Sequence, residues 1–280
     1  MAFDPLVDRL VSLALEEDLS LGDLTTDATI PPHILGKGRL AAKEPLIVAG
    51  CDVAQRVFEA VDSTISLDWL HDDGDAIQTG DTIAWAKGSV LSLLRAERTV
   101  LNFIQRLSGV ATLTRKFADA IEGLPTRIVD TRKTTPGWRT LEKAAVRAGG
   151  AFNHRFSLGS GVLIKDNHID SGGGVQAAVE SARQYAPHLM AIEVEVRSLD
   201  ELRQAITSGA DIVLLDNMDL STLRSAVEIC RNSGVRTEAS GGVSLETIRD
   251  VALTGVDFIS SGALTHSAPS MDIHMKVKPL

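Results

Sequence analysis

The sequence predicts an α/β protein that consists of a small N-terminal α+β domain and an incomplete α/β barrel of six or seven strands. From residue 126 onward, short apolar runs typical of buried parallel strands alternate with helical segments. Polar residues end successive strand candidates at spacings of 21, 24 and 21 positions, namely Glu195, Asp216, Ser240 and Ser261. This regular period indicates a barrel, and roughly 140 residues are too few for the eight units of a complete one.

The composition is that of an ordinary globular chain. Of the 280 residues, 44% are hydrophobic and 23% are charged, which allows a sizeable core. The formal net charge of -9 argues against nucleic acid or an anionic membrane as the main partner. Cys51 and Cys230 lack the spacing of a zinc site or a disulfide framework and predict reduced thiols. No apolar run could cross a bilayer, and acidic residues flank the first apolar residues, so we expect a soluble, cytoplasmic protein.

Residues 1–108 predict the α+β domain. Asp4 predicts the N-cap of a helix, whose buried stripe would comprise Leu6, Leu10, Val11 and Leu13 to Leu15. Residues 18–32 are rich in Asp, Thr and Gly and predict a loop. Between residues 38 and 88, short strand patterns are separated by the turns DDGD and QTGD, and one helix is predicted at 52–61.

A longer helix is predicted at 91–107. Its polar residues recur at steps of three and four positions on one side: Arg95, Arg98, Asn102 and Gln105. This side is either a water-exposed face, or it delivers an arginine to a binding site or to a partner subunit. Periodicity alone leaves both interpretations open.

Residues 109–265 predict the barrel domain. The strand candidates are 127–130, 162–166, 190–196, 211–216, 235–240 and 256–262. Helical patterns fill four of the gaps, at 175–185, 198–208, 220–232 and 244–253. Residues 266–280 show no helical pattern, and we expect this tail to pack on the first domain.

Cationic residues concentrate in one stretch of this acidic chain. Residues 127–168 contain eight Lys and Arg residues against three acids. Lys143 and Arg147 are expected on the solvated face of a helix that begins near residue 140. The other basic residues follow strand patterns or a Gly-Gly break, where loops collect function: Arg132, Lys133, His154, Arg155, Lys165 and His168. They predict a binding site for a small anion.

Carboxylates and glycines end the later strands. Glu195 and Asp216 would lie at the carboxyl ends of neighbouring strands, where they either bind Mg²⁺ or balance nearby lysines. The segments SGG (240–242) and SSG (260–262) predict turns whose backbone N–H groups hold a phosphate. The sequence therefore predicts an organic anion together with a phosphorylated, magnesium-bound second substrate.

At these residues the sequence resembles the quinolinate phosphoribosyltransferase family. The matching segments run in family order from about residue 15 to 267: EEDLSLGDLTTD, ERTVLNFIQRLSGVAT, DTRKTTPGWRTLEKAAVRAGGAFNHR, VLIKDNHI, IEVEV, LLDNM, EASGGV and GVDFISSGALTHS. The resemblance implies transfer of ribose 5-phosphate from phosphoribosyl pyrophosphate to quinolinate, with loss of CO2. The products would be nicotinate mononucleotide, pyrophosphate and CO2, a late step of NAD biosynthesis. The implied fold, a small α/β domain with an incomplete barrel, agrees with the patterns above.

The resemblance also implies roles for individual residues. The carboxylates of quinolinate would be bound by Arg132, His154, Arg155 and Lys165, with Lys133 between the two substrates. Glu195 and Asp216 would bind Mg²⁺ or the ribose hydroxyls. The 5-phosphate would be bound by Ser240, Gly241, Gly242, Ser261 and Gly262, with His266 close by. Arg98 would reach the active site of a neighbouring subunit, which implies a homodimer or a larger assembly.

The implied chemistry needs no covalent nucleophile, so Lys133 and Lys165 are interpreted as electrostatic groups that act with Glu195 and Asp216 in catalysis. Four alternatives remain. They are a phosphoribosyltransferase-like relative with another acceptor, a nicotinate-specific enzyme, a Schiff-base aldolase on Lys165, and a non-catalytic anion-binding protein. One departure from the family pattern puts Ser160 and Gly161 where an Asp is usual. We expect this departure to alter a contact near the site without changing the reaction.

Overall fold

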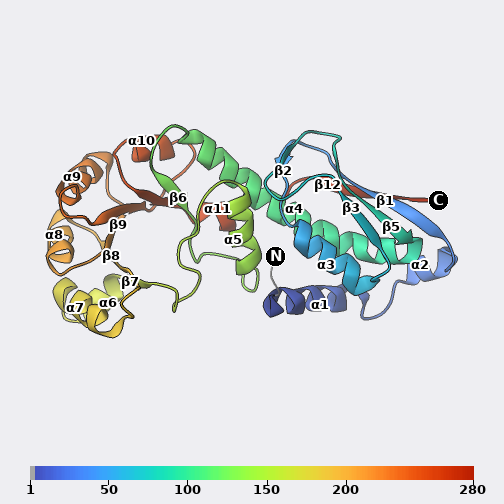
Figure 1. Ribbon diagram of the computed structural model, residues 1–280, viewed down its shortest axis with the longest axis horizontal. Helices are drawn as coiled ribbons and strands as arrows, with labels where there is room; N and C mark the ends of the chain where they lie inside the picture. The colour runs from blue at the N-terminus through green and yellow to red at the C-terminus, as the bar shows by residue number, and fades with distance from the viewer. Residues whose placement is uncertain (1–3) are drawn as a thin grey trace. The chain divides into compact units, whose positions relative to one another are not determined.

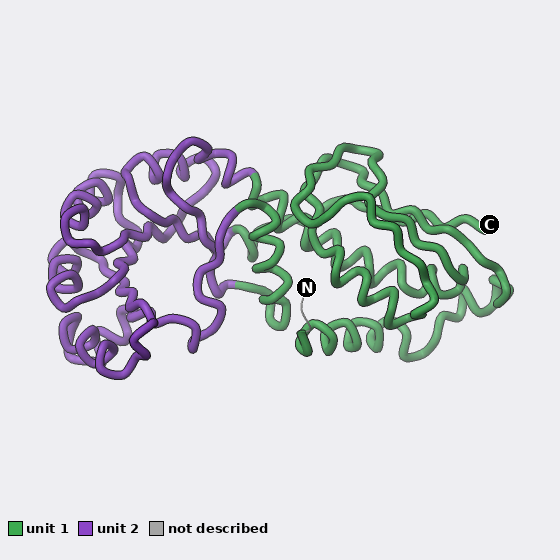
Figure 2. Tube along the Cα trace, viewed as in Figure 1, with its two compact units in different colours: residues 1–115, 134–150, 264–280 green, residues 116–133, 151–263 purple. Residues whose placement is uncertain are grey.

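A computed structural model describes residues 4–280. The chain forms two compact units, which Figure 2 distinguishes by colour. The first unit contains the chain up to Arg115 together with Thr134–Gly150 and Leu264–Leu280. The second contains Lys116–Lys133 and Ala151–Ala263. The boundary predicted at residue 108 falls within one continuous helix, α4 (Val90–Ala120), which extends the helix predicted at 91–107.

The first unit is built on an antiparallel sheet with the order β12-β1-β5-β3. Its strands are β1 (Leu35–Ala42), β3 (Ser66–Trp69), β5 (Thr82–Ser89) and β12 (Ile273–Pro279), and a small second sheet pairs β2 (Leu46–Ile47) with β4 (Ala76–Ile77). The C-terminal strand β12 pairs with β1 from Gly36↔Pro279 to Ala42↔Ile273. The tail thus completes the sheet of the first unit, as a strand that the sequence pattern did not identify.

Three N-terminal helices belong to this unit: α1 (Pro5–Leu19), α2 (Leu24–Thr29) and α3 (Cys51–Val61). Asp4 caps α1 as predicted, through a bond that its side chain accepts from the Leu6 N–H. The predicted stripe is wrong in part, because Val7 and Val11 are buried whereas Leu6 and Leu13 are exposed. The loop predicted at 18–32 is also wrong in part, because the Asp23 side chain accepts from the Thr26 N–H and starts α2.

Helix α4 contacts the sheets through its polar residues as well as its apolar side. The Gln105 side chain donates through Nε2 to the Ile273 carbonyl of β12 at 2.7 Å, and the Gln105 backbone carbonyl accepts from the Met271 N–H. The Thr112 hydroxyl accepts from the Ile47 N–H at 2.8 Å. Two residues of the predicted polar side therefore make contacts within the first unit. Gln105 bonds to the backbone of Met271 and Ile273, and Arg95 forms an ion pair with Asp27.

Helix α5 (Arg139–Ala148) is covered on several sides. The prediction that Lys143 lies on a solvated face is wrong, because Lys143 is buried, while Arg147 is exposed as expected. Glu142 is fully buried and lies 3.0 Å from the Arg106 guanidinium of α4. Its carboxylate also accepts from the Thr135 N–H and hydroxyl, which holds the segment before α5 in place.

The second unit contains a parallel sheet of six strands in the order β6-β11-β10-β9-β8-β7. They are β6 (Arg127–Val129), β7 (Val162–Ile164), β8 (Ile192–Val196), β9 (Ile212–Asp216), β10 (Arg236–Ser240) and β11 (Phe258–Ser260). Figure 1 shows helices on the outside of this curved sheet. Within residues 4–280, β6 and β7 form its two edges, so the barrel is incomplete, as predicted.

The helices of this unit are α6 (Asp166–Ser171), α7 (Val175–Tyr185), α8 (Leu199–Thr207), α9 (Leu220–Cys230) and α10 (Ile248–Ala252), and α11 (Ala263–His266) begins at its end. The sequence pattern missed α6, because Lys165 and Asp166 were assigned to the preceding strand. The strand instead ends at Ile164, and Lys165 is the N-cap of α6. None of the helices formed by residues 4–280 is both long enough and apolar enough to span a membrane.

Candidate active site

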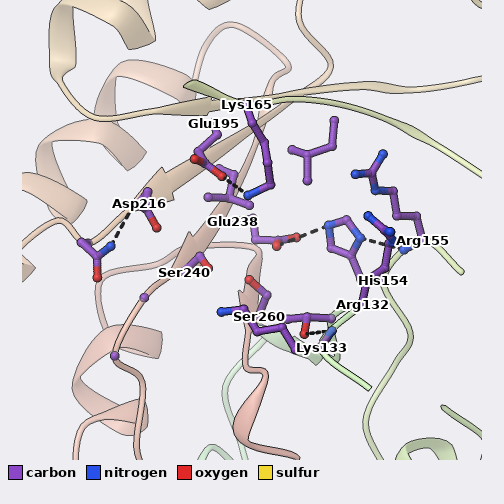
Figure 3. Close-up of a pocket in the computed structure, with 16 residues that line it drawn as sticks. Arg132, Lys133, His154, Arg155, Lys165, Glu195, Asp216, Glu238, Ser240 and Ser260 are labelled. Carbon is purple, nitrogen blue, oxygen red and sulfur yellow. Dashed lines mark hydrogen bonds and ion pairs between the residues drawn. The ribbon is translucent and has the colours of Figure 1, made fainter. Parts of the chain in front are cut away.

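A cavity of about 640 Å³ lies at the carboxyl ends of the parallel strands (Figure 3). Each of the six strands contributes a residue at or near its end, which is where an α/β barrel places its active site. The cavity is lined by Thr131, Arg132, Lys133, His154, Arg155, Leu163, Lys165, Glu195, Leu214, Asp216, Asn217, Glu238, Ser240, Gly241, Gly242 and Ser260.

Most of the predicted site residues therefore lie together in the second unit. Ser261 and Gly262 are not among the lining residues, and the neighbouring Ser260 contributes instead. The Ser261 N–H donates to the Val129 carbonyl at 3.0 Å, so the prediction that this turn leaves its backbone N–H groups to a phosphate is wrong at Ser261. Arg98, which is exposed on α4, and His266, whose Nδ1 lies 2.7 Å from the Ser267 hydroxyl, belong to the first unit.

The cationic side of the cavity is anchored by Asp130, which follows β6 and is fully buried. Its carboxylate accepts from the Asn153 amide at 2.6 Å and from the His154 N–H at 2.9 Å. Asp130 thus holds the Asn153-His154-Arg155 segment next to the end of β6, which Arg132 follows. Because this role depends on residues 23 and 24 positions away, the sequence alone did not identify it.

Two guanidinium groups face the same cavity. Burial lowers the pKa of Arg155, and the positive charge of Arg132 lowers it further. Arg155 also donates through Nη1 to the Gly161 carbonyl at 2.9 Å. The unusual Ser160-Gly161 pair therefore belongs to the turn that contacts Arg155. A bound anion would relieve the repulsion between the two arginines, because each guanidinium can hold a carboxylate with two hydrogen bonds.

Lys165 and Glu195, which both line the cavity, form an ion pair of 2.6 Å. The backbone of Lys165 is held by His168, whose Nδ1 accepts from the Lys165 N–H at 2.9 Å. His168 of the basic cluster therefore caps α6 through this nitrogen. On the next strand, Asp216 accepts from the Asn217 amide at 2.8 Å. Two carboxylates in one cavity provide the hard oxygen ligands that Mg²⁺ prefers.

The turn after β10 requires glycine. Gly241 and Gly242 have φ values of +98° and +61°, and Asn217 opposite them also has a positive φ of 52°. A Cβ on Gly241 would lie 2.2 Å from Oδ1 of Asn217. The backbone at Gly241 therefore lies closer to the Asn217 side chain than a Cβ atom at this position would permit. The following helix α10 begins only at Ile248, so the predicted helix at 244–253 is shorter than expected.

A buried group of three side chains lies in the barrel interior. The ring of His154 contacts two carboxylates, with Nε2 3.0 Å from Glu193 and 3.6 Å from Glu238. The sequence alone assigned no role to Glu193 or Glu238. The available signal was the alternation along β10, which places Glu238 on the same face as Ser240.

Two family models cover nearly the whole chain. The N-terminal domain of quinolinate phosphoribosyl transferase matches residues 23–108, and its C-terminal domain matches residues 110–276. A relative from Synechocystis, named a probable nicotinate-nucleotide pyrophosphorylase [carboxylating], is 42% identical over 97% of this chain and 92% of its own. A relative from Nicotiana glauca, named a mitochondrial quinolinate phosphoribosyltransferase [decarboxylating], is 42% identical over 96% of this chain and 81% of its own.

A solved structure shows the same fold. The crystal structure of NadC from Streptococcus pyogenes matches 100% of this chain and 99% of its own, with a TM-score of 0.95 and 41% identity. The matches in sequence and in structure agree with the cavity chemistry described above. The chain therefore belongs to the quinolinate phosphoribosyltransferase family.

Proposed function

We propose that this chain transfers the phosphoribosyl group of phosphoribosyl pyrophosphate to the ring nitrogen of quinolinate. The bound product then loses its 2-carboxylate as CO2, which leaves nicotinate mononucleotide, and pyrophosphate is released. The observation that carries this proposal is the cavity itself. Its lining combines the cations Arg132, Arg155 and Lys165 with the carboxylates Glu195 and Asp216 and with a glycine turn. Such a cavity suits a dianionic acid and a phosphorylated sugar at the same time.

Quinolinate carries two carboxylates, and their desolvation must be offset by cations. Arg132 and Arg155 would bind them bidentately, and Lys165 would exchange its bond with Glu195 for one to the substrate. Lys133, which is exposed beside Arg132, would lie between the two substrates and stabilise the leaving pyrophosphate. The family resemblance also gives His154 a carboxylate-binding role, although its ring nitrogens already have partners inside the protein.

The 5-phosphate would be held at Ser240, Gly241 and Gly242, which line the cavity. Gly262 and His266 are included in this phosphate site on the family resemblance. Ser261 could contribute only through its hydroxyl, because its N–H is used between strands.

Glu195 and Asp216 have the chemistry to hold Mg²⁺, since both are carboxylates at the ends of adjacent strands and both line the cavity. Bound there, the ion would offset negative charge on the leaving pyrophosphate. The same carboxylates favour the positive charge that develops on the ribose during transfer. Arg132 and Arg155 hold the ring carboxylates, so the ring nitrogen is oriented towards the ribose.

No covalent intermediate is needed for this sequence of steps. Once ribosylated, the ring nitrogen is positively charged and stabilises the carbanion that forms as CO2 departs. Lys165 would act as a cation, which pairs with Glu195 before quinolinate binds and with a substrate carboxylate afterwards.

We also infer a homodimer, or a larger assembly built from it, in which Arg98 reaches the partner's cavity. Its exposure on α4 supports this assignment. A cytoplasmic location is proposed from the two free thiols, Cys51 and Cys230.

The test is release of CO2 and formation of nicotinate mononucleotide from quinolinate, phosphoribosyl pyrophosphate and Mg²⁺, with nicotinate as a parallel acceptor. Turnover with quinolinate but not with nicotinate supports the proposal. Ser160→Asp should keep this preference for quinolinate. Binding of both ligands without turnover would favour a relative with another acceptor. A borohydride-trapped adduct on Lys165 would favour the aldolase.

A further inference from the structure

Three nearly buried side chains lie close together in the barrel interior, and two of them, His154 and Glu238, line the cavity. His154, Glu193 and Glu238 have side chains that are 13%, 7% and 5% exposed. They come from three separate segments, the loop after α5 and the strands β8 and β10. Figure 3 shows the His154 ring between the Glu238 carboxylate and Arg155. The His154 ring therefore contacts the backbone of Arg155, whose side chain lines the cavity.

The hydrogen bonds define which ring nitrogen of His154 carries a proton. The Arg155 backbone N–H donates to Nδ1 at 2.7 Å, and a backbone amide can only donate, so Nδ1 has no proton. Nε2 lies 3.0 Å from a carboxylate oxygen of Glu193, which can only accept when ionised. The proton of the neutral ring is therefore on Nε2, where it points to the Glu193 carboxylate.

This arrangement conflicts with direct recognition of a substrate carboxylate by His154. A carboxylate offers only acceptors, so it cannot take the place of the Arg155 N–H at Nδ1. At Nε2 it would have to displace Glu193, whose carboxylate is nearly buried and would lose a bond that it cannot replace with water.

The second carboxylate, Glu238, supports the assignment of Glu193 as the acceptor of the hydrogen bond from His154 Nε2–H. Oε1 atoms of Glu193 and Glu238 are buried without a hydrogen-bond partner among the described residues. Burial, reinforced by the charge of Glu193, raises the pKa of Glu238 to about 7. The Glu238 oxygen lies 3.6 Å from Nε2 and the Glu193 oxygen 3.0 Å, so the geometry makes Glu193 the acceptor for His154.

We propose that Glu193 and His154 are positioning residues for quinolinate: Glu193 holds the Nε2–H form of His154, and His154 holds the Arg155 backbone so that the Arg155 guanidinium faces the cavity. His154 then gives the substrate no hydrogen bond. This inference rests on the proposed function and revises the carboxylate-binding role that the family resemblance gives to His154.

The first test is nitrogen NMR of protein labelled at histidine, with His154 assigned from the His154→Asn spectrum. In the free protein we expect an unprotonated Nδ1 and a protonated Nε2, and saturation with quinolinate should preserve this form. Conversion to the doubly protonated ring when quinolinate binds would overturn the proposal. So would a metal ion held by the three side chains in the purified protein, because Nε2 would then carry no proton.

Two substitutions of His154 separate positioning from direct binding. In His154→Asn, the new side-chain carbonyl can occupy the place of Nδ1 and accept from the Arg155 N–H. In His154→Gln, the new amide reaches instead to the place of Nε2. We expect His154→Asn to raise KM for quinolinate only about threefold, and His154→Gln to raise it about tenfold or more, a loss of the size expected for one hydrogen bond. The reverse order would overturn the proposal.

Substitution of Glu193 provides the third readout. Glu193→Gln retains an acceptor for Nε2–H and should keep KM close to that of the unmodified enzyme, whereas Glu193→Ala should raise KM for quinolinate about tenfold with a smaller change in kcat. An equal loss of kcat in both variants would contradict positioning. Failure of the proposed function is distinguishable, because the unmodified protein would then not turn over quinolinate, while the tautomer of His154 could still be measured.

Discussion

The ammonium of Lys165 lies 2.6 Å from the carboxylate of Glu195, although each is expected to bind a different ligand. Lys165 is 47% exposed and Glu195 only 11%, so the lysine is the partner that can turn towards a substrate. In this structure the two charges satisfy each other. Binding of quinolinate must therefore compete with Glu195 for Lys165, and a cation at Glu195 would release Lys165 for that role.

This pair predicts opposite effects of two substitutions. Lys165→Met should weaken quinolinate binding by about 10- to 100-fold, the contribution of a hydrogen bond between charged groups. Glu195→Gln should leave binding of quinolinate alone as strong or stronger, because Lys165 loses its competing partner, yet it should reduce turnover. Calorimetry with quinolinate and steady-state kinetics measure the two effects. Equal weakening of quinolinate binding in both variants would contradict this account.

The glycine turn after β10 predicts a contrast between two neighbours. A Cβ at Gly241 would lie 2.2 Å from the Asn217 side chain, whereas one at Gly242 would have no atom within 4 Å. Gly242→Ala should cost only about 1–2 kcal/mol of stability, the strain of a left-handed backbone. Gly241→Ala should in addition displace the turn and weaken binding of phosphoribosyl pyrophosphate about tenfold or more. Ligand titration and thermal melts compare the two, and equal ligand affinities would exclude this role for the turn.

The buried Glu238 predicts that stability depends on pH. Its pKa is raised from 4.5 to about 7, so between these values the folded protein binds a proton that the unfolded chain has released. Stability from this group is therefore fully present below about pH 4.5 and declines as pH rises to 7, by an amount on the order of 2–3 kcal/mol. Denaturant unfolding from pH 5 to 8 should show a smaller decline for Glu238→Gln, whose amide does not titrate. Identical pH profiles for both proteins would exclude Glu238 as the source.

The buried ion pair in the first unit predicts strong coupling. Glu142 is fully buried, and Arg106 lies 3.0 Å from it. Arg106→Met leaves an uncompensated buried charge and should cost about 3–5 kcal/mol. The double substitution Arg106→Met with Glu142→Met should cost less than the sum of the two single changes. A double-mutant cycle from denaturant unfolding measures this difference, and additive losses would show that the pair is not coupled.

The shared-site proposal predicts recovery of activity on mixing. Arg98→Ala and Lys133→Ala should each inactivate the enzyme. If Arg98 acts in the neighbouring subunit, each mixed dimer has one intact site out of two. About half of the dimers in an equal mixture are mixed, so the mixture should regain about a quarter of the unmodified activity. If Arg98 acts within its own subunit, mixing recovers nothing. Re-association of unmodified subunits by the same procedure is the control.

Local sequence determined much of the fold and of the site. The apolar runs that end in Asp216 and Ser240 predicted the parallel strands, because side chains alternate along a strand and polar ones collect at its end. Arg132, Arg155 and Lys165 could be assigned to one anion site because the carboxyl ends of parallel strands meet at one edge of a barrel.

Tertiary packing decided what local patterns left open. Lys143 was expected in solvent and is buried, because α5 is covered on several sides. The role of Glu238 depends on His154 and Glu193, which lie 84 and 45 positions earlier in the chain. A local pattern sets the direction of a side chain within its own element. Its burial, hydrogen-bond partners and pKa depend on segments that the chain brings together only when it folds, and those determined how this site is organised.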